Sequence, residues 1–260
     1  MSIRTVKATR YVTPLREGGS LPAIVEADDD GMYVLKFRGA GHGEKALIAE
    51  LIAGETARAL SLPVPEIVFV ELDPVMGRTE PDPEIQDLIK ASAGLNLALD
   101  YLPGSITFDP LAEKVDAGLA SAIVWFDAFV TNVDRTPRNT NMLVWHRKLW
   151  LIDHGSTLYF HHSWENYLGR SRAPFPLIRD HVLLPKAGAL AEADAELSRR
   201  LTPEVIREVV GLVPDEWLGA EPQIGGAAEQ RTAYAEYLLR RLAPPRNFVE
   251  EAEDARTRAV

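Results

Sequence analysis

The sequence predicts an α+β protein in which strands and helices occupy separate parts of the chain. Short β-type runs dominate the first part, and one strong helix interrupts them. After Pro103 and Gly104 the pattern becomes mainly helical, with one β-hairpin inside it. This separation indicates a bilobal protein. We expect a small strand-rich lobe over 1–102, a larger helical lobe over 103–245, and a disordered, charged tail over 246–260.

The first lobe consists of short apolar runs separated by turn residues. Its strands are predicted at residues 23–25, 32–37, 67–72 and 95–102. A helix is predicted over 44–60, because its Ala, Leu and Glu residues have high helix propensity and helical apolar spacing. The region 73–94 has loop composition and is partly helical.

The second lobe is predicted around a buried helix. Residues 117–130 are almost wholly apolar, so this helix should lie inside the lobe rather than on its surface. A polar loop over 132–141 follows it. Two apolar runs, 142–145 and 149–152, then predict a hairpin. Further helices are expected at 201–213 and 230–242.

Composition restricts the classes of function that are open to this chain. The 260 residues are 46% hydrophobic and 25% charged, as in ordinary soluble proteins, with a formal net charge of −10. This charge argues against a general nucleic-acid or anionic-membrane binder. The absence of cysteine excludes disulfides, zinc fingers, iron–sulfur clusters and thiol nucleophiles. With neither a secretory signal nor an apolar run long enough to span a bilayer, we expect a cytoplasmic protein.

Polar residues with the chemistry of phosphoryl transfer gather around the predicted hairpin. Asp134 and Asn139 stand five positions apart in the polar loop, and Asp153 follows the second hairpin arm. The arms of a hairpin are antiparallel neighbours, so Asn139 and Asp153 should lie close enough to share one magnesium ion through oxygen ligands. Asp134 would then orient the attacking hydroxyl. Taken alone, the Asp134–Asn139 spacing is also typical of ordinary turn and cap residues.

A lysine that neutralises phosphate charge is the remaining part of such a site. Lys36 closes the β-type run Val34-Leu35-Lys36, although a lysine at a strand end is most often a solvated edge residue. The helix that follows offers Glu50 and Glu55 as partners that could hold Lys36 extended toward phosphates. We favour Glu50 and expect Glu55 to be a solvated helix residue.

Two further segments could contact a nucleotide. Gly18-Gly19-Ser20 could direct backbone N–H groups at phosphates, although two consecutive glycines also make plain turns. Arg138, inside the polar loop, could reach a phosphate oxygen; capping or a surface ion pair is the alternative. The glycines at 39, 41 and 43 predict a mobile loop before the first helix.

Four segments together resemble the HipA-like kinases, distant relatives of protein kinases and phosphoinositide kinases. The matching segments are residues 18–37, 49–65, 132–145 and 150–155. The resemblance implies a protein-kinase-like fold that binds ATP and Mg²⁺ and transfers the γ-phosphoryl group to a hydroxyl, with Ser or Thr of a protein as the favoured acceptor. A small molecule or a lipid head group is the alternative acceptor, and a nucleotide-binding pseudokinase is the alternative function.

The resemblance also implies roles for individual residues. It assigns phosphate binding to Lys36 with Glu50 as its helix partner, catalysis to Asp134, and magnesium binding to Asn139 and Asp153. It places an inter-lobe hinge that would meet adenine through backbone groups at Leu99, Asp100, Tyr101 and Leu102. Thr136 and His154 depart from the typical catalytic-loop and metal-site motifs, and Gly18 replaces the serine that some members phosphorylate in their own chain.

Overall fold

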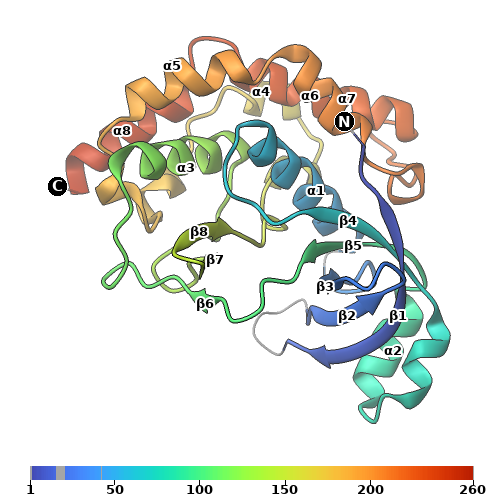
Figure 1. The fold of residues 1–260 in the computed structure, drawn as a ribbon. Coiled ribbons are helices and arrows are strands. Elements are labelled where there is room, and N and C mark those ends of the chain that lie inside the picture. Colours follow the sequence, from blue (N-terminus) through green and yellow to red (C-terminus); the bar gives the residue numbers. More distant parts are fainter. Residues whose placement is uncertain (1, 16–20, 42, 260) are drawn as a thin grey trace.

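The computed structural model describes residues 2–15, 21–41 and 43–259 and has a closed β-barrel beside a helical region (Figure 1). The barrel strands follow the order β1-β2-β3-β5-β4. Their bounds are β1 Thr5–Pro14, β2 Ala23–Ala27, β3 Met32–Lys36, β4 Ile67–Leu72 and β5 Gly94–Asp100. Parallel pairing of β1 with β4 closes the barrel, whereas every other pair in it is antiparallel.

The rest of the chain forms helices and a small second sheet. That sheet contains β6 Ile106–Thr107, β7 Met142–Trp145 and β8 Lys148–Leu151, of which the last two form the predicted hairpin. The α-helices are α1 Glu44–Ala59, α2 Pro83–Ala91, α3 Ala117–Val130, α4 Tyr167–Arg170, α5 Leu190–Arg200, α6 Pro203–Gly211, α7 Ala227–Leu242 and α8 Asn247–Ala259. Short 3₁₀ helices are η1 Pro74–Thr79, η2 Tyr159–His162, η3 Pro176–Asp180, η4 Leu184–Lys186 and η5 Asp215–Trp217. The structure is therefore α+β, as predicted.

Two separate hydrophobic cores stabilise the barrel and the helical region. The barrel core contains side chains such as Val25, Leu35 and Val68. The second core joins α1 to α3, although α1 lies between barrel strands in the sequence. Helix α1 contacts both β4 and α6, so it lies where the barrel meets the helices (Figure 1). Side chains on different faces of α1 can therefore reach one region or the other.

Helix α3 has the limits and the burial that its apolar sequence predicts. The side chain of Asp116 caps its N-terminus by accepting from the N–H of Leu119 at 2.9 Å. At the other end Thr131 adopts a left-handed conformation with φ of 56°, which ends the helix. Nearly all residues from Ala120 to Val130 are buried. The helix thus gives a rigid base to the polar loop that follows it.

The prediction of a disordered tail over 246–260 is wrong for the described part of that range. Residues Asn247–Ala259 form helix α8 instead. Phe248, Ala252 and Ala255 are buried at helical spacing, and α8 packs against α3 and α5. The charged residues between them hide this sparse apolar face in the sequence, because small alanines contribute much of the contact.

Strand β1 is the barrel strand that apolar runs did not identify. Most of its side chains are exposed or half-buried, so it lacks the alternation that marks a strand with one buried face. Pairing with two neighbours rather than its own pattern holds it in place. None of the helices in the described ranges combines the length and apolar character needed to cross a membrane.

Candidate active site

Three elements that are distant in sequence bring Lys36, Glu50 and Asp153 together. The Nζ atom of Lys36, at the end of β3, lies 2.5 Å from Oε2 of Glu50 on α1. The same Nζ atom lies 2.5 Å from Oδ1 of Asp153, which follows β8. Glu55 instead forms an ion pair with Arg58 at 3.0 Å. Of the two glutamates that the sequence offered, Glu50 is therefore the partner of Lys36.

Strand geometry explains the direction of the Lys36 side chain. Successive side chains in a strand point to opposite faces. Leu35 is fully buried in the barrel core, so Lys36 points out of the barrel and toward α1. The register of β3 on β5, which pairs Lys36 with Leu97, fixes this choice of face.

Exposure differs sharply among the three charged groups. The side chain of Glu50 is fully buried, that of Lys36 is 13% exposed, and that of Asp153 is 45% exposed. Burial by itself raises the pKa of Glu50, but the charge of Lys36 and hydrogen bonding from His154 outweigh it and lower that pKa to about 2. Burial lowers the pKa of Lys36, and the charges of Asp153 and Glu50 more than reverse this, so its pKa is raised. Glu50 and Lys36 are therefore both charged at neutral pH.

The structure explains why a histidine occupies position 154, where the sequence departs from the typical metal-site motif. Its backbone N–H donates to Oε2 of Glu50 at 2.8 Å, and its Nδ1 lies 3.3 Å from Oε1 of the same carboxylate. The ring is fully buried and meets the ring of Phe126 edge to face. His154 therefore fills an apolar position and also helps to hold Glu50. The preceding residue, Asp153, has a φ of 56°, an uncommon conformation for a residue with a side chain.

The polar loop over 132–141, here called the catalytic loop, holds Asp134 between two amides. The Nδ2 atom of Asn139 donates to Oδ2 of Asp134 at 3.0 Å, and Nδ2 of Asn141 donates to the same oxygen at 3.3 Å. The N–H of Asp134 itself donates to Oδ1 of Asn132 at 3.0 Å. The five-residue spacing of Asp134 and Asn139 thus corresponds to a direct contact.

The hairpin returns the chain to the end of this loop, as predicted. The last pair of the ladder is Met142 with Leu151, and one further hydrogen bond joins the N–H of Ile152 to the carbonyl of Asn141 at 3.0 Å. Asp153 therefore follows a residue that is bound directly to the loop. In the described residues no hydrogen bond joins Asn139 to Asp153, so a shared cation between them stays a prediction.

The donor set around Asp153 suits magnesium. A half-exposed carboxylate and an amide oxygen are hard oxygen ligands, and Mg²⁺ typically takes only one or two protein carboxylates with the rest from water and phosphate. The Nδ2 atom of Asn139 donates to Asp134, so Oδ1 is the side-chain atom through which Asn139 could bind a metal. Lys36 supplies the neighbouring positive charge. The residues therefore fit a metal-bound triphosphate.

The remaining predicted nucleotide contacts have different outcomes. Gly18, Gly19 and Ser20 lie outside the described residues. Arg138 is exposed and makes no hydrogen bond or ion pair with any described residue, so its role stays a prediction.

The predicted hinge is more restricted than the sequence implied. The N–H groups of Asp100 and Tyr101 donate to the carbonyls of Glu66 and Met32 at 2.8 and 3.0 Å. Leu99 and Leu102 are buried. Two of the expected N–H groups are therefore not free for adenine, and carbonyls or the N–H of Leu102 would have to serve instead.

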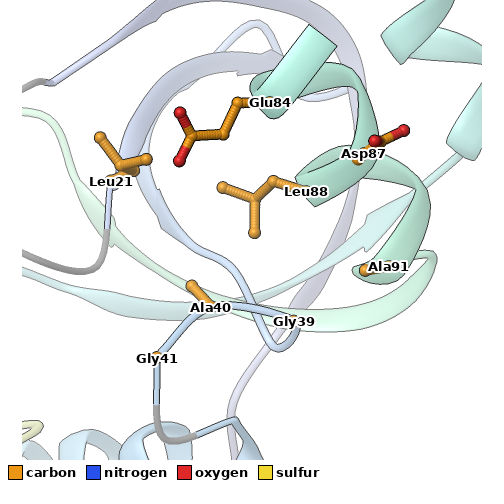
Figure 2. A pocket seen from close by; sticks show the side chains of 8 residues that line it. All are labelled: Leu21, Gly39, Ala40, Gly41, Glu84, Asp87, Leu88 and Ala91. Atoms are coloured by element: carbon orange, nitrogen blue, oxygen red, sulfur yellow. The ribbon is translucent and has the colours of Figure 1, made fainter.

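A cavity of about 360 Å³ lies between α2 and the loop after β3. Figure 2 shows Leu88 and Glu84 of α2 facing Leu21 and Ala40 across it. Among the described residues no predicted site residue lines this cavity, and the two carboxylates found there, Glu84 and Asp87, would repel phosphates. It is a poor candidate for the triphosphate site.

A buried network beneath the catalytic loop is the part of the site that sequence reasoning missed. Asp127 of α3 is fully buried and accepts from Arg135 Nε at 2.6 Å and from His181 Nε2 at 2.9 Å. A single acidic residue in the apolar run 117–130 was the available signal, because an unpaired buried carboxylate is costly. Nothing local in the sequence pointed to His181.

Comparisons with known proteins identify the family and the fold. The family model of HipA-like kinases matches residues 9–250. The crystal structure of the Helicobacter pylori proinflammatory kinase CtkA is similar over 98% of this chain and 97% of that chain, with 13% identity and a TM-score of 0.56. The crystal structure of the Golgi casein kinase is similar over 97% of this chain and 72% of that chain, with 12% identity and a TM-score of 0.50.

These structural similarities establish a protein-kinase-like fold. No curated protein sequence matches the chain significantly. The family match extends over nearly the whole chain and includes all of the strands, loops and helices that bring Lys36, Asp134 and Asp153 into place. The chain therefore belongs to the HipA-like kinase family.

Proposed function

We propose that this protein transfers the γ-phosphoryl group of Mg-ATP to a hydroxyl acceptor, with Ser or Thr of a protein as the favoured acceptor. One observation carries the proposal. Lys36 is held between Glu50 and Asp153 at 2.5 Å from each, although Asp153 is 117 positions away in sequence. A lysine fixed by a buried glutamate and directed at a half-exposed aspartate is the arrangement that a metal-bound triphosphate requires.

The proposed bilobal arrangement assigns the nucleotide to the junction of the barrel and the helical region. Lys36 would neutralise the phosphates that are not transferred, and Glu50 would keep it extended. Asn139 and Asp153 would hold Mg²⁺, whose charge stabilises the phosphate oxygens as negative charge shifts toward the leaving group. Arg138, Gly18, Gly19 and Ser20 are proposed as further phosphate contacts, and residues 99–102 as the adenine hinge.

Asp134 is proposed as the residue that orients the acceptor. Both side-chain amides that contact it bind Oδ2, so Oδ1 is the atom that can accept the hydroxyl proton. The acceptor oxygen forms a bond to the γ-phosphorus while the bond from that phosphorus to the bridging oxygen breaks, and ADP leaves. The hydroxyl proton passes to Asp134 and then to solvent. Positioning and charge stabilisation supply most of the acceleration in such transfers.

The test is a transfer assay with labelled ATP and Mg²⁺, with casein as a general protein acceptor and water as the fallback acceptor. We expect slow transfer or hydrolysis that Asp153→Ala and Asp134→Asn each abolish. Asp254→Ala, an exposed acid on α8, is the matched control and should keep the wild-type rate. Equal rates in wild type and Asp153→Ala would refute the proposal.

Two other outcomes would change the proposed substrate or activity. Hydrolysis without labelling of protein, but with labelling of an added small alcohol or lipid head group, would replace the protein acceptor. Binding of Mg-ATP, detected as a higher melting temperature, without turnover over long incubation would indicate a pseudokinase.

A further inference from the structure

The buried network beneath the catalytic loop is centred on the carboxylate of Asp127. Its Oδ1 accepts from Nδ2 of Asn132 at 2.8 Å. Its Oδ2 accepts from Nε of Arg135 at 2.6 Å and from Nε2 of His181 at 2.9 Å. All four residues are buried, and Asp127 is fully so. The network therefore has a fixed geometry that solvent does not compete with.

Two branches of this network converge on Asp134. Asn132 uses its amide nitrogen on Asp127 and its Oδ1 on the N–H of Asp134 at 3.0 Å. Arg135 donates through Nη1 to the carbonyl of Asn141, whose side-chain amide donates to Oδ2 of Asp134 at 3.3 Å. Asp134 is thus held from its backbone and from its carboxylate, and each branch contains a side chain bound to Asp127.

His181 closes the network from a different part of the chain. Its Nδ1 accepts from the N–H of Leu183 at 3.0 Å, so this nitrogen carries no proton. The proton is therefore on Nε2, which donates it to Asp127. The next residue, Val182, donates its N–H to the carbonyl of Arg135 at 3.1 Å. The segment 181–183 thus binds both the anchor and the loop.

The catalytic loop needs such an anchor because it has no regular structure of its own. From Asn132 to Asn141 it contains neither helix nor strand, and most of its fixed contacts are made by side chains. Apolar packing could stabilise α3 equally well at this position, since replacing a buried ion pair by well-packed apolar residues is often neutral for stability. A charged network at this place therefore points to positioning.

We propose that Asp127 and His181 are positioning residues that fix the carboxylate of Asp134 for phosphoryl transfer. The inference rests on the proposed function, because it assumes that Asp134 orients the acceptor. Neither residue touches a substrate; both act through Asn132, Arg135 and Asn141. The effect should therefore fall on the turnover rate, whereas nucleotide binding through Lys36 and Asp153 should change little.

Two substitutions of His181 separate positioning from packing. His181→Gln keeps a donor near the place of Nε2 and removes the acceptor for Leu183. His181→Asn keeps an acceptor near the place of Nδ1 and removes the donor to Asp127. We expect His181→Asn to lower kcat by about 10- to 100-fold with KM for ATP changed less than about threefold, since small misplacements of reacting groups cost up to about 100-fold. The kcat of His181→Gln should be at least about tenfold higher than that of His181→Asn.

Asp194, a half-buried carboxylate with two donors of its own, supplies a control for the general cost of disturbing a hydrogen-bonded carboxylate. It accepts from Trp125 Nε1 at 2.7 Å and from Arg246 Nε at 2.6 Å. Among the described residues none of its hydrogen bonds reaches the catalytic loop. Asp194→Asn should lower the melting temperature without the selective loss of kcat. Asp127→Asn, the bolder variant, should lose more rate than His181→Asn.

The outcomes distinguish this inference from the proposed function. A wild-type kcat in His181→Asn, or equal losses in the two His181 variants, would overturn the positioning role. An inactive Asp134→Asn in the same assay would leave the proposed function standing in that case. Unchanged transfer in Asp134→Asn would instead overturn the proposed function itself.

Discussion

Glu50 and Asp127 are both fully buried carboxylates with a basic partner, yet their surroundings differ. The partner of Asp127, Arg135, is fully buried too, and its other contacts are also inside the protein. The partner of Glu50 is Lys36, which also binds Asp153, a residue with a side chain that is 45% exposed. We call the Asp127 network closed, because the charged partners in it are all buried. We call the Glu50–Lys36–Asp153 network open, because its last member is exposed to solvent.

The two kinds of network suit two different tasks in a phosphotransferase: holding one geometry and exchanging a bound partner. A closed network holds one geometry, because each group in it would lose a partner if it moved. An open network can exchange a partner: Lys36 can turn from Asp153 to a phosphate while Glu50 keeps hold of it. We therefore propose that Asp127 maintains the geometry of the catalytic loop and that Glu50, Lys36 and Asp153 serve nucleotide exchange.

The largest expected effect comes from opening the closed network. Asp127→Ala leaves the guanidinium of Arg135 buried without its carboxylate, which typically costs about 3–5 kcal/mol in unfolding free energy. Urea denaturation of the variant and the wild type measures the loss. Asp87→Ala, which breaks an exposed pair with Lys90, should cost less than about 0.5 kcal/mol. A loss below about 1 kcal/mol for Asp127→Ala would show that the network is not closed.

The acid side of the stability curve tests the charge on Glu50. Its pKa is about 2 in the folded protein, below its ordinary value of 4.5, so its contribution is present above about pH 4.5 and is lost as pH falls toward 2. That contribution is about 3 kcal/mol by linkage.

Glu50→Gln removes this contribution, so the stability gap between wild type and variant should narrow as the pH falls from 5 to about 2. Urea midpoints over this range measure the gap, and the other carboxylates act equally in both proteins. A gap that stays constant with pH would mean that folding leaves the pKa of Glu50 unchanged.

Nucleotide binding tests whether Asp153, the exposed member of the open network, takes part in binding Mg-ATP. At about 100 times its dissociation constant, Mg-ATP should stabilise the folded protein by about 2.7 kcal/mol, seen as a rise in melting temperature. Asp153→Asn should remove most of this shift, and His181→Asn should retain it, because only the first changes the open network. Equal loss of the shift in both variants would contradict the separation of tasks.

The smallest expected effect is that of Asp153→Asn on the protein without nucleotide. Its side chain is nearly half exposed, and Lys36 keeps its pair with Glu50. Exposed ion pairs contribute about 0–1 kcal/mol, so the unfolding free energy should change by no more than that. A larger loss would indicate that Asp153 belongs to the folded core rather than to an exchangeable end.

Local patterns were sufficient for the contacts that form within a short segment. The spacing of Asp134 and Asn139 predicted a loop constellation, and the two amino acids are in direct contact. The apolar run of α3 and the helical pattern of α1 predicted both helices close to their observed limits. In each case the sequence pattern and the structure that it predicts lie within one short segment of the chain. The face of α8 was too sparse for such a signal, and the prediction there failed.

Contacts between distant segments could be predicted only where both residues belong to a recognisable motif. Lys36 and Asp153 were expected to meet because strand, helix and hairpin each carry a recognisable piece. His181 was not expected, because it lies 54 positions from Asp127 and no motif surrounds it. The backbone donors of Asp100 and Tyr101 could not be judged either, since strand pairing uses them.

The sequence by itself determined which side chains can do chemistry here, because their types and short-range spacing are properties of the chain. It also determined the main helices and the hairpin, whose apolar periodicity reports burial directly. Only the tertiary structure decided which carboxylate is closed off and which reaches solvent. Exposure and hydrogen-bond partners depend on segments that meet after folding, and no single stretch of sequence contains both sides of such a contact.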